Sequence, residues 1–311
     1  MSKYLVTGGA GFIGSHIVEA LVKAGHYVCV LDNFSSGKLT NLKGFENKIH
    51  LIKGDICSKS TCFKATKNID FVLHQAALRS VPKSMQEPHE YNRVNVDGTL
   101  NMLEASKENK VKRFVFASSS SVYGEVKKFP EKENFIPSPI SPYALSKLAG
   151  EYYCKIFSLH YGLPAIALRY FNVFGPRQTL DDEYAVVIPK FINCILNNKR
   201  PPIFGNGKQS RDFTFVKNVV YANLAAASAK NVKFGVFNVA TGKATTVLDL
   251  VKILNQLLGK DIKPLLLPVR AGDVFKTLAD ISQAAKILKF KPVFDFSKGL
   301  KITLDYWNST K

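Results

Sequence analysis

The chain has 311 residues, of which 46% are hydrophobic and 11% aromatic, values typical of a globular protein of about two domains. No apolar run approaches the roughly 20 residues of a membrane span. The first residues, MSKYLVTGG, lack the anatomy of a signal peptide. Five cysteines without CxxC or metal spacing are typical of reduced thiols. We therefore expect a cytoplasmic protein that has neither a bound metal nor a membrane partner.

The chain is strongly basic, with 43 Lys and Arg residues against 24 Asp and Glu residues and a formal net charge of +19. A charge excess of this size can indicate a nucleic acid or an anionic membrane as partner. The lysines, however, are spread singly or in pairs along the whole chain. The densest stretch, KKFPEKE at 127–133, is mixed with acids. We therefore expect a solvated surface that attracts anionic substrates, and no nucleic-acid partner.

The first 170 residues alternate short apolar runs with helical segments, which is typical of βαβ units and a parallel sheet. Strands are expected at 4–8, 27–32, 49–54, 71–75, 113–118 and 164–170, and helices at 12–25, 94–109 and 143–160. Later helices are expected at 185–198, 245–259 and 297–308. We predict an α/β fold, with a Rossmann-type doubly wound sheet over 1–172 and a smaller α/β domain over 173–311. A return segment near 212–232 is expected to rejoin the first domain.

The stretch VTGGAGFIG at 6–14 places Gly8, Gly11 and Gly14 between the first strand and the first helix. Glycines allow a tight turn there and let a pyrophosphate approach the backbone N–H groups at the helix N-terminus. The second strand ends at Asp32, whose carboxylate can accept hydrogen bonds from a ribose diol and repels a 2′-phosphate. NAD, not NADP, is therefore the expected cofactor. Further cofactor contacts are expected from Phe12, Ile13, Asn33, Asp55 and Ile56.

Tyr143 and Lys147 stand four residues apart in SPYALSK, just after Pro142. Residues with this spacing are neighbours on one face of a helix. An ammonium near a phenol favours the phenolate, so we expect the pKa of Tyr143 to lie below its usual value of about 10. Such a tyrosine can act as a general base on an alcohol. The alternative is an exposed helix that carries an ordinary tyrosine and lysine.

Five motifs occur in order along the chain: the glycine turn, HQAA at 74–77, SSSSVYG at 118–124, YxxxK at 143–147 and RYFNVFGPRQ at 169–178. With them the chain resembles the extended short-chain dehydrogenase/reductase superfamily over essentially its whole length. Within that superfamily it looks most like the UDP-glucose and UDP-N-acetylglucosamine 4-epimerases. The resemblance implies that Tyr143 is the base and Lys147 its partner. It also implies a catalytic hydroxyl at Ser119, although the neighbouring Ser118, Ser120 and Ser121 leave that position open by one residue.

The same resemblance implies further contacts with the cofactor and the substrate. Those with the cofactor are Ala76, Ala77, Asn95 and Tyr170. Those with a UDP-sugar are Ser119, Ser121, Asn172, Val187, Ile188, Phe204, Arg211, Arg270, Asp273 and Thr277. The two arginines would clamp the diphosphate, a task that suits a guanidinium fork. The helices near 95–109 and 143–160 would form the four-helix bundle of a homodimer.

The expected reaction is 4-epimerisation through a transient 4-keto sugar. The related 4,6-dehydratases carry an Asp-Glu pair directly after the catalytic hydroxyl, where this chain has Ser120 and Ser121. The small Thr277 would admit an N-acetyl group, whereas Arg79 is larger than expected beside an acetamide. UDP-glucuronate epimerisation and other UDP-sugar chemistry remain alternatives. A dinucleotide-sensing or RNA-binding protein without activity is the alternative from another functional class.

Overall fold

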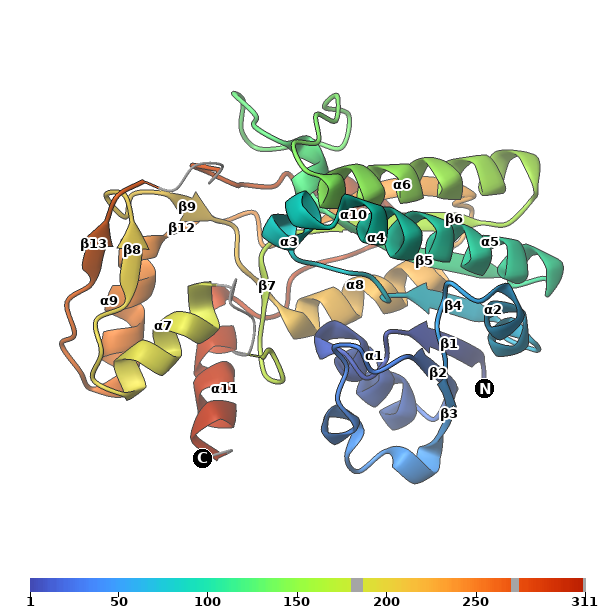
Figure 1. The fold of residues 1–311 in the computed structure, drawn as a ribbon, viewed down its shortest axis with the longest axis horizontal. Coiled ribbons are helices and arrows are strands. Elements are labelled where there is room, and N and C mark those ends of the chain that lie inside the picture. The colour runs from blue at the N-terminus through green and yellow to red at the C-terminus, as the bar shows by residue number, and fades with distance from the viewer. Residues whose placement is uncertain (180–186, 270–273, 310–311) are drawn as a thin grey trace.

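The computed structural model describes residues 1–179, 187–269 and 274–309. A parallel seven-stranded sheet forms its centre, in the order β11-β6-β5-β4-β1-β2-β3 (Figure 1). Its strands are β1 (Lys3–Thr7), β2 (Tyr27–Asp32), β3 (Ile49–Lys53), β4 (Phe71–His74), β5 (Arg113–Ser119), β6 (Ala165–Tyr170) and β11 (Phe234–Val239). The first six coincide with the predicted runs to within one residue at each end. The prediction of a Rossmann-type α/β fold is confirmed.

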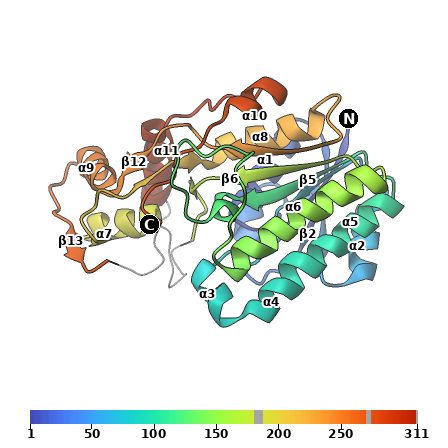
Figure 2. The same ribbon diagram turned by 90° about the horizontal axis from the view of Figure 1, so that it is seen from above.

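Helices cover both faces of this sheet, as Figure 2 shows from above. One face carries α2 (Lys59–Thr66), α5 (Gly98–Glu108) and α6 (Pro142–His160), and the other carries α1 (Phe12–Lys23), α8 (Val216–Ser228) and α10 (Ser282–Ile287). Successive strand residues point to opposite faces. Leu5 and Leu31 therefore pack on the face that α2, α5 and α6 cover, and Val6 and Val30 pack on the face that α1, α8 and α10 cover. Both faces are buried along the inner strands, which therefore consist mainly of apolar residues, whereas the edge strand β3 is largely exposed.

The elements between β4 and α5 are short. They are α3 (Val81–Gln86), α4 (Pro88–Asn92) and a π-helical turn, Arg93–Asp97. The sequence predicted one regular helix over 94–109, and in the structure the first turn of that segment is π-helical. A π-helical turn often marks a functional position, and this one holds the buried Asn95.

A smaller lobe, on the left in Figure 1, has a core of its own. It consists of α7 (Val187–Leu196), α9 (Val247–Leu258) and α11 (Phe296–Ser309), and of the strand pairs β8 (Pro202–Phe204) with β13 (Leu265–Leu267) and β9 (Ser210–Arg211) with β12 (Thr245–Thr246). Apolar residues recur at helical spacing along α7 and α9, and their buried faces meet around Phe191, Ile195, Leu250 and Leu254. The strands β7 (Val173–Phe174) and β10 (Thr214–Phe215) pair where the chain passes between the lobes.

The chain enters the smaller lobe after β6 and then returns to the large sheet. On its return, α8 packs against the sheet, and β11 pairs with β6 from Phe234 opposite Ala165 to Val239 opposite Tyr170. Strand β11 lies beyond the return segment expected near 212–232 and was not predicted from the sequence. The large sheet therefore takes its seventh strand from the second half of the chain.

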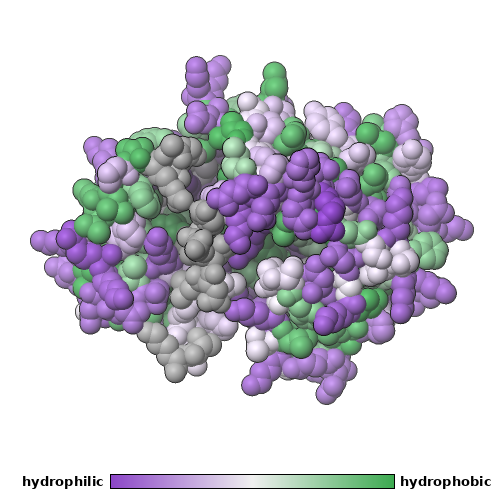
Figure 3. All heavy atoms as spheres, viewed as in Figure 1, coloured by the Kyte–Doolittle hydropathy of each residue, from purple (hydrophilic) through white to green (hydrophobic). Residues whose placement is uncertain are grey.

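The face of the molecule in Figure 3 carries hydrophilic side chains over both lobes, with apolar residues scattered among them. This spread agrees with the even distribution of lysines along the sequence. Among the residues with a described position, no helix has the length and apolar character needed to cross a bilayer.

A buried ion pair joins α6 to the sheet. Glu151 accepts hydrogen bonds from the guanidinium of Arg169 at 2.8 and 2.7 Å, and both side chains are about 95% buried. The hydroxyl of Ser118 also donates to Glu151, and the Tyr123 ring stacks 4.6 Å from the guanidinium carbon. The pair thus connects α6 with the ends of β5 and β6.

We expect Glu151→Gln to lower the free energy of unfolding by about 3–5 kcal/mol, because it leaves the buried Arg169 charge without a counter-ion. Urea titration followed by circular dichroism measures this loss. Glu104→Gln is the matched control, because the ion pair of Glu104 with Lys59 is solvent-exposed and its loss should cost less than about 1 kcal/mol. Equal effects of the two substitutions would contradict the prediction.

Candidate active site

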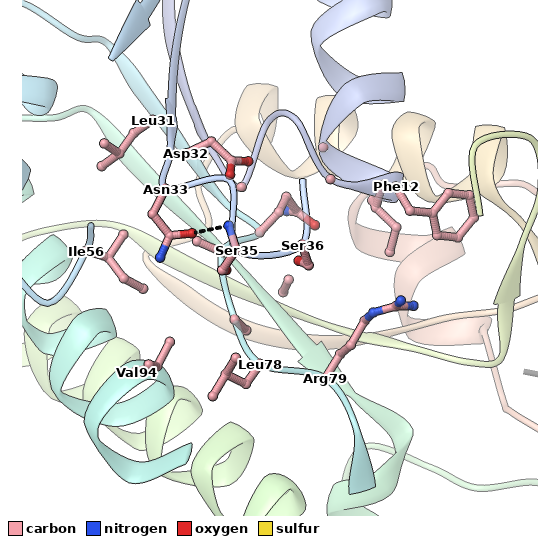
Figure 4. Close-up of a pocket in the computed structure, with 18 of the residues that line it drawn as sticks. Phe12, Leu31, Asp32, Asn33, Ser35, Ser36, Ile56, Leu78, Arg79 and Val94 are labelled. Atoms are coloured by element: carbon pink, nitrogen blue, oxygen red, sulfur yellow. Dashed lines mark hydrogen bonds between the residues drawn. The ribbon is translucent and has the colours of Figure 1, made fainter. Parts of the chain in front are cut away.

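A cavity opens at the carboxyl ends of the strands, where the strand order reverses between β1 and β4. Open α/β sheets bind dinucleotides at such a switch point. The cavity is lined by nearly all the residues that the sequence assigned to the cofactor: Gly8, Gly11, Phe12, Ile13, Gly14, Asp32, Asn33, Asp55, Ile56, Ala76, Ala77, Tyr143, Lys147 and Tyr170. Phe12, Asp32, Asn33 and Ile56 are labelled in Figure 4.

The glycine turn is shaped for a close approach of backbone atoms. A Cβ atom on Gly14 would lie 2.1 Å from the carbonyl oxygen of Gly8, a separation that no side chain tolerates. Gly8 itself has φ +65°, and a Cβ there would lie 2.8 Å from the Ala76 nitrogen. No side chain caps the N-terminus of α1, so its first N–H groups are left for a ligand. The turn therefore fits the pyrophosphate of a dinucleotide.

Asp32 is 7% exposed and lies at the edge of this cavity (Figure 4). Its carboxylate accepts backbone hydrogen bonds from Ala10 at 2.9 Å and from Phe34 at 2.8 Å. Burial raises the pKa of Asp32, and these two hydrogen bonds oppose the rise. The bonds fix the carboxylate at the end of β2, where its remaining lone pairs suit an adenosine ribose.

The sequence missed several polar residues of the loop after β2. Ser35, Ser36 and Asn41 also line the cavity, and the Ser35 N–H donates to the Asn33 side chain at 3.0 Å (Figure 4). The Asn33 amide in turn donates to Asp55 at 2.9 Å. The only local signal was the turn-forming composition of DNFSSG directly after β2.

Asn95 is the one assigned cofactor residue that does not line the cavity. Its side chain accepts a hydrogen bond from the Leu78 N–H at 2.8 Å and donates to the Leu78 carbonyl and the Ser146 hydroxyl, both at 3.0 Å. It therefore holds the loop after β4, which carries Ala76 and Ala77, against α6.

Tyr143 and Lys147 lie on one face of α6, whose first turn is capped by a 3.1 Å hydrogen bond from the Ala144 N–H to the Ser141 hydroxyl. The Lys147 ammonium donates to the Ala117 carbonyl at 2.9 Å and lies 5.9 Å from the centre of the Tyr143 ring. Burial lowers the pKa of Lys147 to about 8.

The expected lowering of the Tyr143 pKa by Lys147 is wrong. Burial raises the pKa of Tyr143, and the opposing influences are a hydrogen bond with Ser119 and the charge of Arg79. The sequence shows the spacing of the two side chains but not their removal from water, which favours the neutral phenol.

The four serines at 118–121 have different partners. Ser118 donates to the buried Glu151, so its hydroxyl belongs to the structural network behind the site. Ser119 hydrogen-bonds with Tyr143 and accepts from the Ser121 hydroxyl at 2.9 Å. Ser120 begins a 3-10 turn, Ser120–Tyr123. Of the four, Ser119 is the one placed to act with Tyr143.

A second cavity of about 1030 Å³ adjoins the first, and Tyr143, Ser118 and Tyr170 line both. Of the predicted substrate residues, Ser119, Ser121, Asn172, Arg211 and Thr277 line it, as does Ser120. Val187, Ile188 and Phe204 do not; the Ile188 side chain is 1% exposed in the core of the smaller lobe. Arg270 and Asp273 lie outside the described residues.

Three of these substrate residues form one cluster. The Asn172 amide donates to the Thr277 hydroxyl at 3.0 Å, and the Asp212 N–H donates to the same oxygen at 3.3 Å. Arg211, next in sequence to Asp212, donates to the Phe275 carbonyl at 3.2 Å. This cluster forms the wall of the second cavity that belongs to the smaller lobe.

The fold and these two cavities define a class: a dinucleotide-binding α/β enzyme with an acid/base pair between its cofactor cavity and a second, large cavity. Among the described residues there is no cluster of side chains that could hold a metal ion.

The model of the NAD dependent epimerase/dehydratase family matches residues 4–240, and the chain belongs to this family. It is therefore an NAD-dependent enzyme.

A UDP-N-acetylglucosamine 4-epimerase from Methanobrevibacter ruminantium, solved with UDP-N-acetylmuramic acid, is 45% identical, with a TM-score of 0.96 and coverage of 100% of this chain and 99% of that one. A UDP-glucose 4-epimerase from Thermotoga maritima, solved with UDP-glucose, is 40% identical, with a TM-score of 0.93 and coverage of 99% of both chains. A UDP-glucuronic acid 4-epimerase from Bacillus cereus, solved with UDP-glucuronic acid and NAD, is 34% identical, with a TM-score of 0.91 and coverage of 99% and 100%.

Proposed function

We propose that the chain is a UDP-hexose 4-epimerase that uses NAD. The observation that carries this proposal is the position of Tyr143 and Ser119. They form one hydrogen-bonded pair, and Tyr143 lines both the dinucleotide cavity and the second cavity. A hydroxyl-bearing ligand in the second cavity would therefore meet its acid/base beside the cofactor. The similarity to three UDP-sugar 4-epimerases supports the same reaction.

Proton transfer in this reaction would run through Tyr143. Bound NAD would supply the hydride acceptor for C4 of the sugar, and the residues that line the first cavity would hold it there. Tyr143 takes the proton of the 4-hydroxyl in the first half of the reaction and gives it back in the second, so one residue is base and then acid. The raised pKa of Tyr143 favours the second role, and the Ser119 hydrogen bond and the Arg79 charge, which both lower that pKa, support the first.

The second cavity is large enough for a sugar to turn between the two half-reactions. Its 1030 Å³ lies at the upper end of the usual range for ligand pockets, roughly 300–1,000 Å³. Thr277, a small residue, lies in its wall. We propose that both UDP-N-acetylglucosamine and UDP-glucose are substrates, with the corresponding galacto sugars as products.

The reaction is tested by mixing the purified chain with UDP-N-acetylglucosamine, UDP-glucose or UDP-glucuronate without added reductant and resolving the products by NMR. Formation of the galacto epimers of the first two at constant NAD is the expected result. Turnover of UDP-glucuronate alone would support 4-epimerisation but contradict the proposed substrates. Absence of turnover with every UDP-sugar would overturn the proposal.

We also propose that the chain is a homodimer, in which α5 and α6 of each copy form a four-helix bundle. On α6 the apolar side chains Leu145, Tyr152, Ile156 and Leu159 are between 43% and 61% exposed. Their spacing of seven, four and three residues places them on one face of the helix. A contiguous exposed apolar face on a long helix is typical of a helix–helix interface.

We expect Ile156→Glu to convert the dimer to a monomer, because it places a charge in the apolar face of α6. Sedimentation velocity measures the mass of both forms. Val293→Glu is the control, because Val293 is 62% exposed outside α6 and its substitution should leave the mass unchanged. A monomeric wild-type chain would overturn the proposed dimer.

A further inference from the structure

The wall of the second cavity contains a buried carboxyl group that the proposed proton transfer does not use. Glu131 lies between the 3-10 turn and α6, is 2% exposed and lines the cavity together with Ser121 and Thr277. Its Oε2 atom has no hydrogen-bond partner within the described part of the chain. A buried polar atom without a hydrogen-bond partner is destabilising, so a partner from the cavity would be favourable.

Backbone hydrogen bonds hold Glu131 against the segment 278–280, on the same side of the cavity as Thr277. The Glu131 N–H donates to the Leu278 carbonyl at 2.7 Å, and its carbonyl accepts from the Asp280 N–H at 2.8 Å and from the Asn238 amide at 3.0 Å. Its carboxyl group accepts from the Leu278 N–H. Glu131 therefore stands directly beside the segment that carries Thr277.

The charged groups that face Glu131 are Asp212 and Arg211. Asp212 is fully buried, and its carboxylate accepts from the Thr241 N–H and hydroxyl, the Gly242 N–H and the Ala279 N–H, at 2.7 to 3.3 Å. Burial raises the pKa of Asp212 as well, but four donors oppose that rise and favour its ionised form, whereas Glu131 has one donor. Of the two neighbouring carboxyls, Glu131 is thus the one that keeps its proton.

The titration of Glu131 agrees with this assignment. Burial is the main cause that raises its pKa, to about 8; the negative charge of Asp212 adds to the rise, and the Leu278 hydrogen bond and the Arg211 charge oppose it. Near pH 7 the side chain is a neutral carboxylic acid, which has an O–H to donate.

We propose that Glu131 is a sugar-binding residue, and that its protonated carboxyl donates a hydrogen bond from Oε2 to the hexose of the UDP-sugar. The proposal rests on the proposed function and adds a specificity determinant to the same cavity. A neutral donor suits this position, because a carboxylate there would repel the diphosphate of the same ligand.

Calorimetric binding of UDP-N-acetylglucosamine and of UDP to the NAD-loaded protein, over pH 6.5 to 9.5, tests this role. We expect Glu131→Ala to weaken UDP-N-acetylglucosamine binding about tenfold and to change UDP binding less than twofold. Wild-type affinity for the sugar nucleotide should fall above about pH 8, as Glu131 loses its proton. Glu131→Gln keeps an N–H donor and cannot ionise, so its affinity should stay level over the same range.

Glu133→Gln is the matched control. Glu133 is a second carboxyl of raised pKa in the same segment, but it accepts from the Asn238 N–H at 2.8 Å and does not line the cavity. It should keep the wild-type pH profile. Equal losses of UDP and UDP-N-acetylglucosamine binding in Glu131→Ala, or a wild-type pH profile in Glu131→Gln, would overturn the role of Glu131. If Glu131→Ala does not fold, the Glu131→Gln profile alone decides. Calorimetry reports binding whether or not the bound sugar is then epimerised, so a failure of the proposed reaction would be seen separately.

Discussion

Tyr143→Phe is expected to lower kcat of the epimerisation about 10³-fold, because it removes the phenolic oxygen that takes and returns the proton of the 4-hydroxyl in the proposed reaction. The ring itself remains, so its packing beside Tyr91, with ring centres 6.5 Å apart, is kept. NMR of the product mixture measures the rate, and absorbance of the protein after denaturation measures its NAD content, which should not change.

The control for this substitution is Tyr153→Phe, which also removes one phenolic oxygen from α6. Tyr153 packs against the core between α6 and the sheet and lines neither cavity. Its substitution should leave kcat within about twofold of wild type. If Tyr143→Phe kept a tenth of the wild-type rate, another group would have to be the base.

Thr277→Tyr is expected to change the substrate preference, with turnover of UDP-N-acetylglucosamine falling about a hundredfold relative to that of UDP-glucose. A tyrosine adds an aromatic ring to the wall of the second cavity and so fills the space that an N-acetyl group would need. The ratio of the two kcat/KM values, measured by NMR under the same conditions, gives the effect directly.

Thr277→Ser separates the effect of volume from that of hydrogen bonding. It keeps the oxygen that accepts from the Asn172 amide and the Asp212 N–H. Its preference should therefore equal that of the wild type. If Thr277→Tyr slowed both substrates equally, the position would act on the cavity as a whole and not on the N-acetyl group.

The strands β1 to β6 could be predicted from the sequence because each contains a short run of mostly apolar residues bounded by turn residues. The inner strands of a parallel sheet are buried on both faces, although the edge strand β3 is largely exposed. The same reasoning missed β11. Its sequence, FGVFNV, contains a glycine and an asparagine, which are unfavourable in strands. It is a strand because β6 offers it an open edge, and β6 lies 69 residues earlier when counted from Ala165 to Phe234. That pairing is non-local and leaves no local signal.

The residues of the site also divide into those that local sequence predicts and those that depend on contacts between distant segments. The glycine turn and Asp32 are fixed by local geometry, and the structure brings them together in one cavity. Glu131 lies in KKFPEKE, which looks solvated in the sequence because most of its residues are charged, yet Glu131 is 2% exposed. Burial depends on which segments fold over one another. For the same reason the sequence predicted the wrong direction for the pKa of Tyr143.

The position of β11 in the large sheet also orders events during protein synthesis. A ribosome releases residues 165–170 long before residues 234–239, so β6 emerges as an open edge with unpaired backbone groups. By the time β11 reaches that edge, α7 and β8 of the smaller lobe have already been translated. Domains generally fold as units during translation, but here neither lobe is complete before the other has begun. The nascent chain must therefore protect the open edge of β6 until Val239, the last residue of β11, has been made.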